Sequence, residues 1–177
     1  LGLRKLKDVA VEQKLYPRYS DYLKGLLVRE TELFFEEILH HDLSVLNFID
    51  SDFMMVNDRL AIHYGIKGVK GPKFRRVPVP ADGRRGGLMG HSSILTLTTC
   101  GTRTSPVMRG VWTLEKLLGQ EPPPPPKEVP ALPPDTRGAT TIRDRLAKHR
   151  EDPSCARCHD KIDPLGLALE NYNVIGQ

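Results

Sequence analysis

The stretch PSCARCHDKIDPLGL, residues 153–167, contains two of the three cysteines in this 177-residue chain. Cys155 and Cys158 are three residues apart, and His159 follows directly. Two thiols at this spacing can each add across one vinyl group of a haem, and the adjacent imidazole is then placed to bind the iron. The stretch therefore predicts one covalently attached haem c per chain, with His159 as the proximal iron ligand.

Other uses of the same motif agree less well with the sequence. A structural zinc site usually has four Cys or His ligands, and only Cys100 lies outside the motif. A thioredoxin-like redox pair starts a helix after a strand in a βαβ unit, whereas a charged helix and Asp152-Pro153 are expected before this motif. A disulfide between Cys155 and Cys158 would form only where haem attachment fails.

The residues after the motif are largely apolar and are candidates for the wall of a haem pocket, which must exclude water. Pro164 and Gly166 are expected to form a turn over the haem edge. An ordinary core segment would have a similar pattern, and both interpretations can hold together. The candidate haem contacts are Ile162, Pro164, Leu165 and Leu167.

The sixth iron position is expected to be filled from upstream of the motif or from another part of the molecule. None of the 18 residues that follow His159 is Met, His or Cys. We predict His91, because the glycines within residues 86–90 allow the backbone to approach a flat cofactor closely. Met89 and Met108 are alternatives, and an open position is a third that would permit ligand chemistry.

Basic residues gather in two places. Arg103 and Arg109 flank a predicted helix start at Ser105, and either guanidinium matches the two oxygens of a haem propionate, although surface charges near a helix end would look the same. The basic stretch within 67–85 predicts a solvated loop or a docking patch for an acidic redox partner. The formal net charge of +4 is too small to indicate nucleic-acid binding.

Residues 1–66 are expected to form a helical module. Apolar residues recur at three- and four-residue steps over 22–39, which is typical of an amphipathic helix. A shorter segment follows near 43–49, and a further helix is expected over 53–63, ended by Gly65. No apolar run in the sequence is long enough to cross a bilayer.

Residues 67–120 are expected to contain the basic loop, a short strand and a helix. The β-branched residues of 92–99 predict the strand, and shorter extended pieces are expected within 77–79. Ser105-Pro106 is typical of a helix start, and Gly119 of its end.

Five consecutive prolines begin at Pro122, and they predict a polyproline strap over residues 121–135. Residues 136–177 are then the haem c attachment segment, with a charged helix before the motif that begins at Thr140 or Thr141 and extends to about Arg150. These 42 residues are few for enclosing a porphyrin, so the haem pocket is expected to be shared with residues 86–118.

Three stretches together resemble the planctomycete-type cytochrome c modules. They are FMMVNDRLAIHYGI (53–66), GLMGHSSILTLTTCGTRTSPVMRGVWTLEKLLGQEPPPPP (87–126) and LAKHREDPSCARCHDKIDPLGLALENYNVIG (146–176). The resemblance implies a large, exported, multidomain protein that carries haem c and has an unknown reaction. It carries Cys155, Cys158 and His159 over as haem attachment residues, and it leaves the sixth ligand open.

The sequence thus predicts a mainly α protein, a helical c-type cytochrome with long loops, a polyproline strap and little β structure. The expected function is one-electron transfer through the haem iron as part of a larger exported redox protein. Two alternatives stay open: a haem enzyme domain with an open or exchangeable axial position, and a haem-stapled structural module of a multihaem complex.

Partner and location follow from the same interpretation. An unidentified redox partner protein is expected, together with other haem domains or subunits, and neither nucleic acid nor a transmembrane segment is expected. Because haem c is attached outside the cytoplasm, the predicted location is periplasmic or extracellular.

Overall fold

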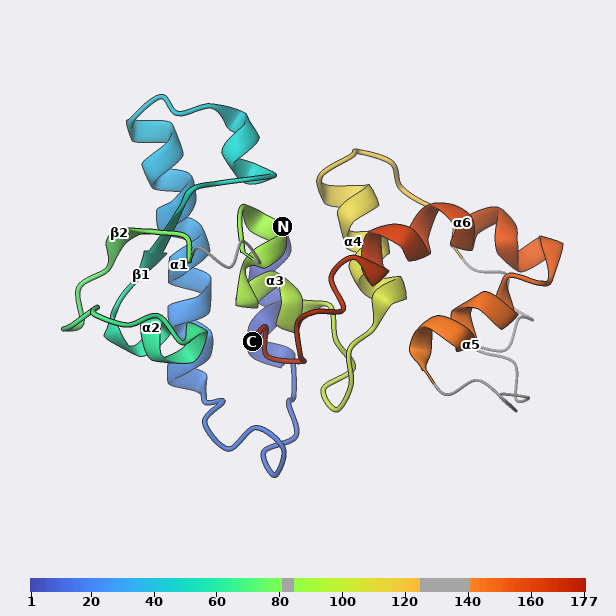
Figure 1. Ribbon diagram of the computed structural model, residues 1–177, viewed down its shortest axis with the longest axis horizontal. Helices are drawn as coiled ribbons and strands as arrows, with labels where there is room; N and C mark the ends of the chain where they lie inside the picture. Colours follow the sequence, from blue (N-terminus) through green and yellow to red (C-terminus); the bar gives the residue numbers. More distant parts are fainter. Residues whose placement is uncertain (81–84, 125–140) are drawn as a thin grey trace. The chain divides into compact units, whose positions relative to one another are not determined.

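The computed structural model describes residues 1–80, 85–124 and 141–177, which fall into two compact units (Figure 1). Unit 1 comprises Leu1–Thr104 and Tyr172–Gln177, and unit 2 comprises Ser105–Asn171. Helices outnumber strands in these residues, so the prediction of a mainly α chain is confirmed. Most of the predicted strap lies within 125–140, outside the described residues. Among the helices described, none combines the length and apolarity that a membrane crossing requires.

The longest helix of unit 1, α1 (Asp21–His40), forms where the sequence predicts it. It begins at Ser20, whose side chain accepts a hydrogen bond from the backbone N–H of Leu23 and so satisfies a free helix-end donor. Its buried side includes Leu27 and Phe34, which are fully inaccessible to solvent. The three- and four-residue spacing of its apolar residues therefore does place one face in the core.

The segment predicted as a helix over 53–63 is instead a strand followed by a shorter helix, so that prediction is wrong. Strand β1 (Phe53–Val56) pairs antiparallel with β2 (Arg75–Pro78), with Phe53 opposite Pro78. All four residues of β1 are buried, and a short continuous apolar run does not distinguish a buried strand from a buried helix. The extended pieces expected within 77–79 are confirmed by β2.

Helix α2 (Asp58–Tyr64) follows β1 and is fixed at both ends. Asn57 accepts a hydrogen bond from the backbone N–H of Leu60, which sets the helix start. Gly65 ends the helix at φ 72°, in the left-handed region where glycine carries no Cβ penalty. The predicted end at Gly65 is therefore confirmed.

Residues 92–97, predicted as a strand, form helix α3 (Ser92–Leu97), so this prediction is also wrong. Residues Ser92 to Thr96 are all buried, and α3 packs against α1 and the 3₁₀ helix η1 (Leu3–Asp8). Packing against α1 and η1 overrides the strand preference of the β-branched residues. Two further 3₁₀ helices are η2 (Val45–Phe48) and η3 (Leu88–Gly90).

The core of unit 1 combines residues from both ends of the chain. Val174 and Ile175, near the last residue, are buried in the same cluster as residues of η1, α1, β1 and α2. The buried members are Leu6, Val11, Tyr19, Leu23, Leu27, Met54, Val56, Leu60, Ala61, Val174 and Ile175.

Unit 2 contains three helices in its described residues. Helix α4 (Pro106–Lys116) begins at Ser105 and α5 (Ile142–His149) begins at Thr141, as their capping residues predicted, and α6 (Pro153–Leu167) begins at Asp152. Thr141 and Asp144 form a reciprocal capping box, and Asp152 accepts hydrogen bonds from the backbone N–H and hydroxyl of Ser154. The sequence motif therefore lies in the first two turns of α6.

Helices α4 and α6 touch through glycines. A Cβ at Gly110 would overlap with the carbonyl oxygen of Ile162, and a Cβ at Gly166 would overlap with the carbonyl oxygen of Pro106. The turn predicted at Pro164 and Gly166 is not formed, because both residues continue α6. Gly166 is instead required by the close approach of two backbones, which only a residue without a side chain permits.

Candidate cofactor attachment site

The three motif residues lie on neighbouring positions of one side of α6. Cys155 and Cys158 are one helical turn apart, and His159 is four residues after Cys155, so all three side chains are neighbours on the helix surface. Both thiols are free and partly exposed. The structure therefore presents two partly exposed thiols and an imidazole side by side on one helix.

A buried carboxylate orients the imidazole of His159. Nδ1 of His159 lies 2.8 Å from Oδ1 of Asp163, one turn further along α6. The Asp163 side chain is fully buried, whereas 19% of the His159 side chain is exposed. Because a carboxylate accepts hydrogen bonds, this contact places the ring proton on Nδ1 and leaves the lone pair on Nε2 free to bind a metal.

Helix α5 supports the same ring from a second direction. The His149 ring packs against the His159 ring with a centroid separation of 4.6 Å and an interplanar angle of 82°. Arg150 places its guanidinium 3.7 Å from Oδ2 of Asp163. Burial, and then the neighbouring His159, lower the pKa of His149 and so favour its neutral ring.

A cavity of about 290 Å³ opens beside Cys158. Apolar side chains of Leu114 and Ile162 line one part of it, and the cationic side chains of Arg157 and Lys161 line another. This combination suits a flat apolar group that carries carboxylates at its edge. The remaining lining residues are Gln120, Glu121, Pro122 and Pro123.

The four predicted haem-wall residues have different surroundings. Ile162 is 6% exposed and lines the cavity beside Cys158. Leu167 is buried, Leu165 is half-buried and Pro164 is exposed.

Within 1–80, 85–124 and 141–177, no three His, Cys, Asp or Glu side chains gather in a way that could hold a metal ion, so the four-ligand zinc site is not assembled there.

His91 and Arg103 belong to unit 1, away from the motif in the chain. His91 is 3% exposed, its Nδ1 lies 3.0 Å from the hydroxyl of Thr31, and its ring packs edge-on against Phe34. Burial lowers its pKa to about 3, so the ring is neutral at neutral pH and chemically able to ligate iron. Arg103 is exposed. The roles of both residues stay predictions.

Arg109, the alternative propionate partner, forms interactions within unit 2. Its guanidinium is buried and donates to the carbonyl oxygen of Leu169 and to the carboxylate of Glu170, at 2.6 Å and 2.7 Å. It therefore fastens the end of α6 to α4 and is not directed toward a ligand.

Sequence reasoning missed Asp163, although its position carried a signal. His159 and Asp163 are four residues apart, which is the spacing of facing side chains once the motif is known to be helical. From the sequence, no helix is expected over the motif and a turn is expected directly after Asp163, so this relationship is not recognised.

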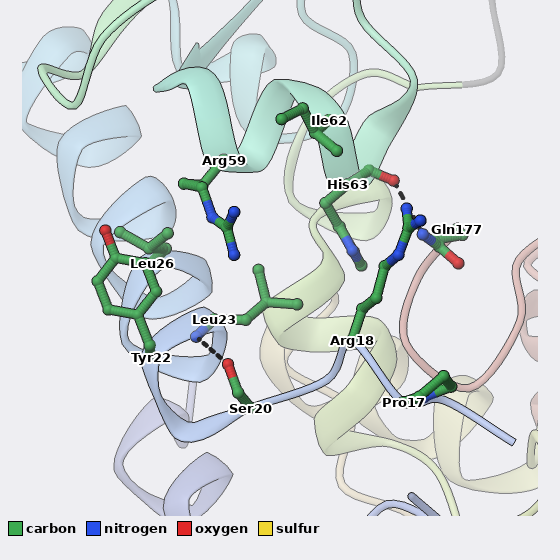
Figure 2. A pocket seen from close by; sticks show the side chains of 10 residues that line it. All are labelled: Pro17, Arg18, Ser20, Tyr22, Leu23, Leu26, Arg59, Ile62, His63 and Gln177. Carbon is green, nitrogen blue, oxygen red and sulfur yellow. Dashed lines mark hydrogen bonds between the residues drawn. The ribbon is translucent and has the colours of Figure 1, made fainter. Parts of the chain in front are cut away.

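Unit 1 has a separate cavity of about 430 Å³ between the start of α1 and helix α2 (Figure 2). The side chains of Arg18 and Arg59 lie on its two sides, and Gln177 donates a hydrogen bond to the backbone oxygen of His63 at its rim. None of the residues predicted to bind a cofactor lines this cavity. The candidate site therefore stays with α6.

Comparison with known proteins finds matches to two domain families. No curated protein and no solved structure matches it. Residues 1–66 match the model of the PSD4 family, described as a protein of unknown function (DUF1592), and residues 85–177 match that of PSCyt3, described as a protein of unknown function (DUF1588). Both domains are found in planctomycete-type multihaem cytochrome c proteins. Since the second match covers more than half of the chain, the protein belongs to the PSCyt3 family of unknown function (DUF1588).

Proposed function

We propose that this chain is a c-type cytochrome module that carries one haem c on Cys155 and Cys158 and transfers single electrons. The observation that carries the proposal is the arrangement on α6: two free thiols one turn apart, with the Nε2 side of His159 left open by the bond from Nδ1 to Asp163. When bound, the haem would supply one-electron transfer between its ferric and ferrous states.

On the protein side, the attachment step would need two accessible thiols. Each thiol would add across one vinyl group of the haem: its S–H bond and the C=C π bond would break, and a C–S bond and a C–H bond would form. No oxidant or reductant is consumed in this addition, but both sulfurs must be reduced. Cys155 and Cys158 are free thiols and partly exposed, which agrees with this requirement.

The surroundings of the thiols also fit a porphyrin. Ile162 and Leu114 provide apolar contacts beside Cys158, and such contacts exclude water and so affect the reduction potential. Arg157 and Lys161 are available to pair with propionates. These two residues of α6 are further candidates for the propionate contact, beside the predicted Arg103.

The second iron ligand is proposed to be His91, as predicted from the sequence. The neutral ring of His91 suits iron ligation. Ligation through Nδ1 would break the contact with the Thr31 hydroxyl, and movement of the ring would disrupt its packing against Phe34. Two histidine ligands would favour a low potential.

A redox partner protein, neighbouring haem domains and an exported location belong to the same proposal. The two matched domain families support it, because both occur in multihaem cytochrome c proteins. The basic residues of β2 and the preceding loop offer a surface for an acidic partner; they are Lys67, Lys70, Lys73, Arg75 and Arg76.

A spectroelectrochemical titration of the matured protein tests electron transfer. We expect a reversible one-electron curve and no rapid carbon monoxide adduct of the reduced form. A rapid adduct would indicate an open iron position and a haem enzyme domain instead. A haem that cannot be reduced and reoxidised reversibly would indicate a structural staple.

A further inference from the structure

We infer that Asp163 is a positioning residue for the iron ligand: it holds His159 by Nδ1, directs Nε2 outward and lowers the reduction potential of the attached haem. The inference rests on the proposed function and deepens it. Its structural basis is the 2.8 Å contact between Nδ1 of His159 and Oδ1 of Asp163.

Burial distinguishes Asp163 from an ordinary surface partner. Its side chain is fully inaccessible to solvent, whereas Asp160 on the same helix is exposed. A hydrogen bond from an imidazole to a carboxylate is stronger where water does not compete for either group. The bond therefore fixes the ring orientation before any cofactor arrives.

Few groups contact the second carboxylate oxygen of Asp163, Oδ2. Oδ2 has no hydrogen-bond partner among the described residues, and the Arg150 guanidinium lies 3.7 Å from it. Arg150 offsets part of the negative charge without taking the oxygen that faces His159. The carboxylate thus keeps its acceptor strength for the Nδ1 proton.

A carboxylate on Nδ1 changes what the ring gives to a metal. Withdrawal of the Nδ1 proton toward Asp163 makes Nε2 a stronger electron donor, and a stronger donor stabilises the ferric state relative to the ferrous state. The His149 ring packs edge-on against the His159 ring, with the centroids 4.6 Å apart, and this contact favours the same ring orientation. We therefore expect a lower potential than an uncharged acceptor at the same position would give.

Two substitutions separate this role from a general effect of charge. Asp163→Asn keeps an acceptor oxygen but removes the negative charge, and Asp160→Asn makes the same charge change at an exposed position one residue after His159. We expect Asp163→Asn to raise the midpoint potential and to alter the electron paramagnetic resonance spectrum of the ferric form, which reports the donor strength of the imidazole. Asp160→Asn should leave both at their wild-type values.

The inference is overturned if Asp163→Asn leaves the potential and the spectrum of a haem-loaded protein unchanged. It is also overturned if Asp160→Asn shifts both equally, because the effect would then be long-range charge. A colourless wild-type protein would instead count against the proposed function, so the two failures can be told apart.

If a variant does not take up haem, the inference can still be tested by a measurement on the haem-free chain. Long-range ¹H–¹⁵N correlation spectra of the full chain distinguish a proton on Nδ1 from one on Nε2 of His159. We expect the Nδ1–H form in the wild type and its loss as the main form in Asp163→Ala. An Nε2–H ring in the wild type would overturn the inference.

Discussion

Gly166 of α6 lies against the carbonyl oxygen of Pro106, the first residue of α4, with no room for a Cβ between them. Gly110 of α4 makes the reciprocal approach to the carbonyl oxygen of Ile162. The helix that carries both cysteines is therefore held against its neighbour by backbone contact at two points.

Gly166→Ala should destabilise unit 2 because the added methyl group would overlap with backbone that cannot rotate away. Overpacking of this kind costs about 1 to 3 kcal/mol or more of unfolding free energy. Denaturant unfolding of the full chain measures it. Gly25→Ala is the matched control, since Gly25 lies within α1 and a methyl group added there would have no neighbouring atom within 4 Å. Equal stability of the two variants would contradict the helix contact.

Arg109→Ala should also destabilise unit 2, by removing the buried guanidinium that pairs with Glu170 at 2.7 Å and with the carbonyl oxygen of Leu169. Breaking a buried ion pair by removing one partner costs about 3 to 5 kcal/mol. Arg143→Ala provides a control at an exposed position of α5, outside the cavity beside Cys158. If haem uptake fell in Arg109→Ala while its unfolding free energy stayed at the wild-type value, Arg109 would be a ligand contact after all.

Unit 1 should lose stability as pH rises from 6.5 to 8 because of Glu30. Burial raises the pKa of Glu30 to about 8, while the hydrogen bond from Tyr64 partly opposes the shift. The folded state therefore retains a proton that the unfolded chain has already released above its ordinary pKa of 4.5. The stabilisation that the proton on Glu30 provides is fully present below pH 4.5 and is lost as the pH rises to about 8. The part lost between pH 6.5 and 8 is roughly 1 to 2 kcal/mol of unfolding free energy.

Glu30→Gln should flatten this alkaline decline, because a neutral amide has no proton to lose. Chemical denaturation at several pH values, with wild type and variant side by side, measures the difference. His63 does not confuse this window: burial lowers its pKa to about 4, so its own effect is confined to pH values below about 6.5. A wild type with constant stability from pH 6.5 to 8 would show that Glu30 is already ionised.

His91→Ala tests the predicted second iron ligand. We expect the ferric haem to change from low spin to high spin, because one strong-field ligand is lost. The absorption and electron paramagnetic resonance spectra of matured protein measure the change. Met89→Leu is the matched control for the alternative ligand. An unchanged spin state in His91→Ala would assign His91 to the core contacts with Thr31 and Phe34 alone.

Local signals predicted the helices well where caps and spacing agreed. The sequence predicts helix starts at Ser105 and near Thr141, and each of these residues accepts a hydrogen bond from the backbone N–H three residues later. These starts are readable from the sequence because the interaction that fixes them is local.

The wrong secondary-structure predictions occur where contacts between residues far apart in the sequence determine the structure. Residues 53–56 are apolar without a break, and only their pairing with β2 makes them a strand. Residues 92–97 have strand-like composition, but burial among η1 and α1 selects a helix. Pro164 and Gly166 look like a turn, yet contact with α4 explains why Gly166 belongs in a helix.

The sequence predicts a cofactor attachment site because Cys155, Cys158 and His159 have the spacing that covalent attachment of a porphyrin would require. That assignment stays a prediction. The contact of His159 with Asp163 depends on an unbroken helix, and the approach of His149 depends on how α5 packs on α6. Neither relationship is visible without the fold.

The mass of the matured chain tests the central claim most directly. Coexpression with a c-type haem maturation system, with export, should give a mass equal to the polypeptide plus one intact haem, and a c-type pyridine haemochrome spectrum. Cys155→Ala with Cys158→Ala should abolish the adduct, and Cys100→Ala should retain it. A wild-type mass equal to the bare polypeptide, while a control cytochrome in the same cells is matured, would contradict haem attachment.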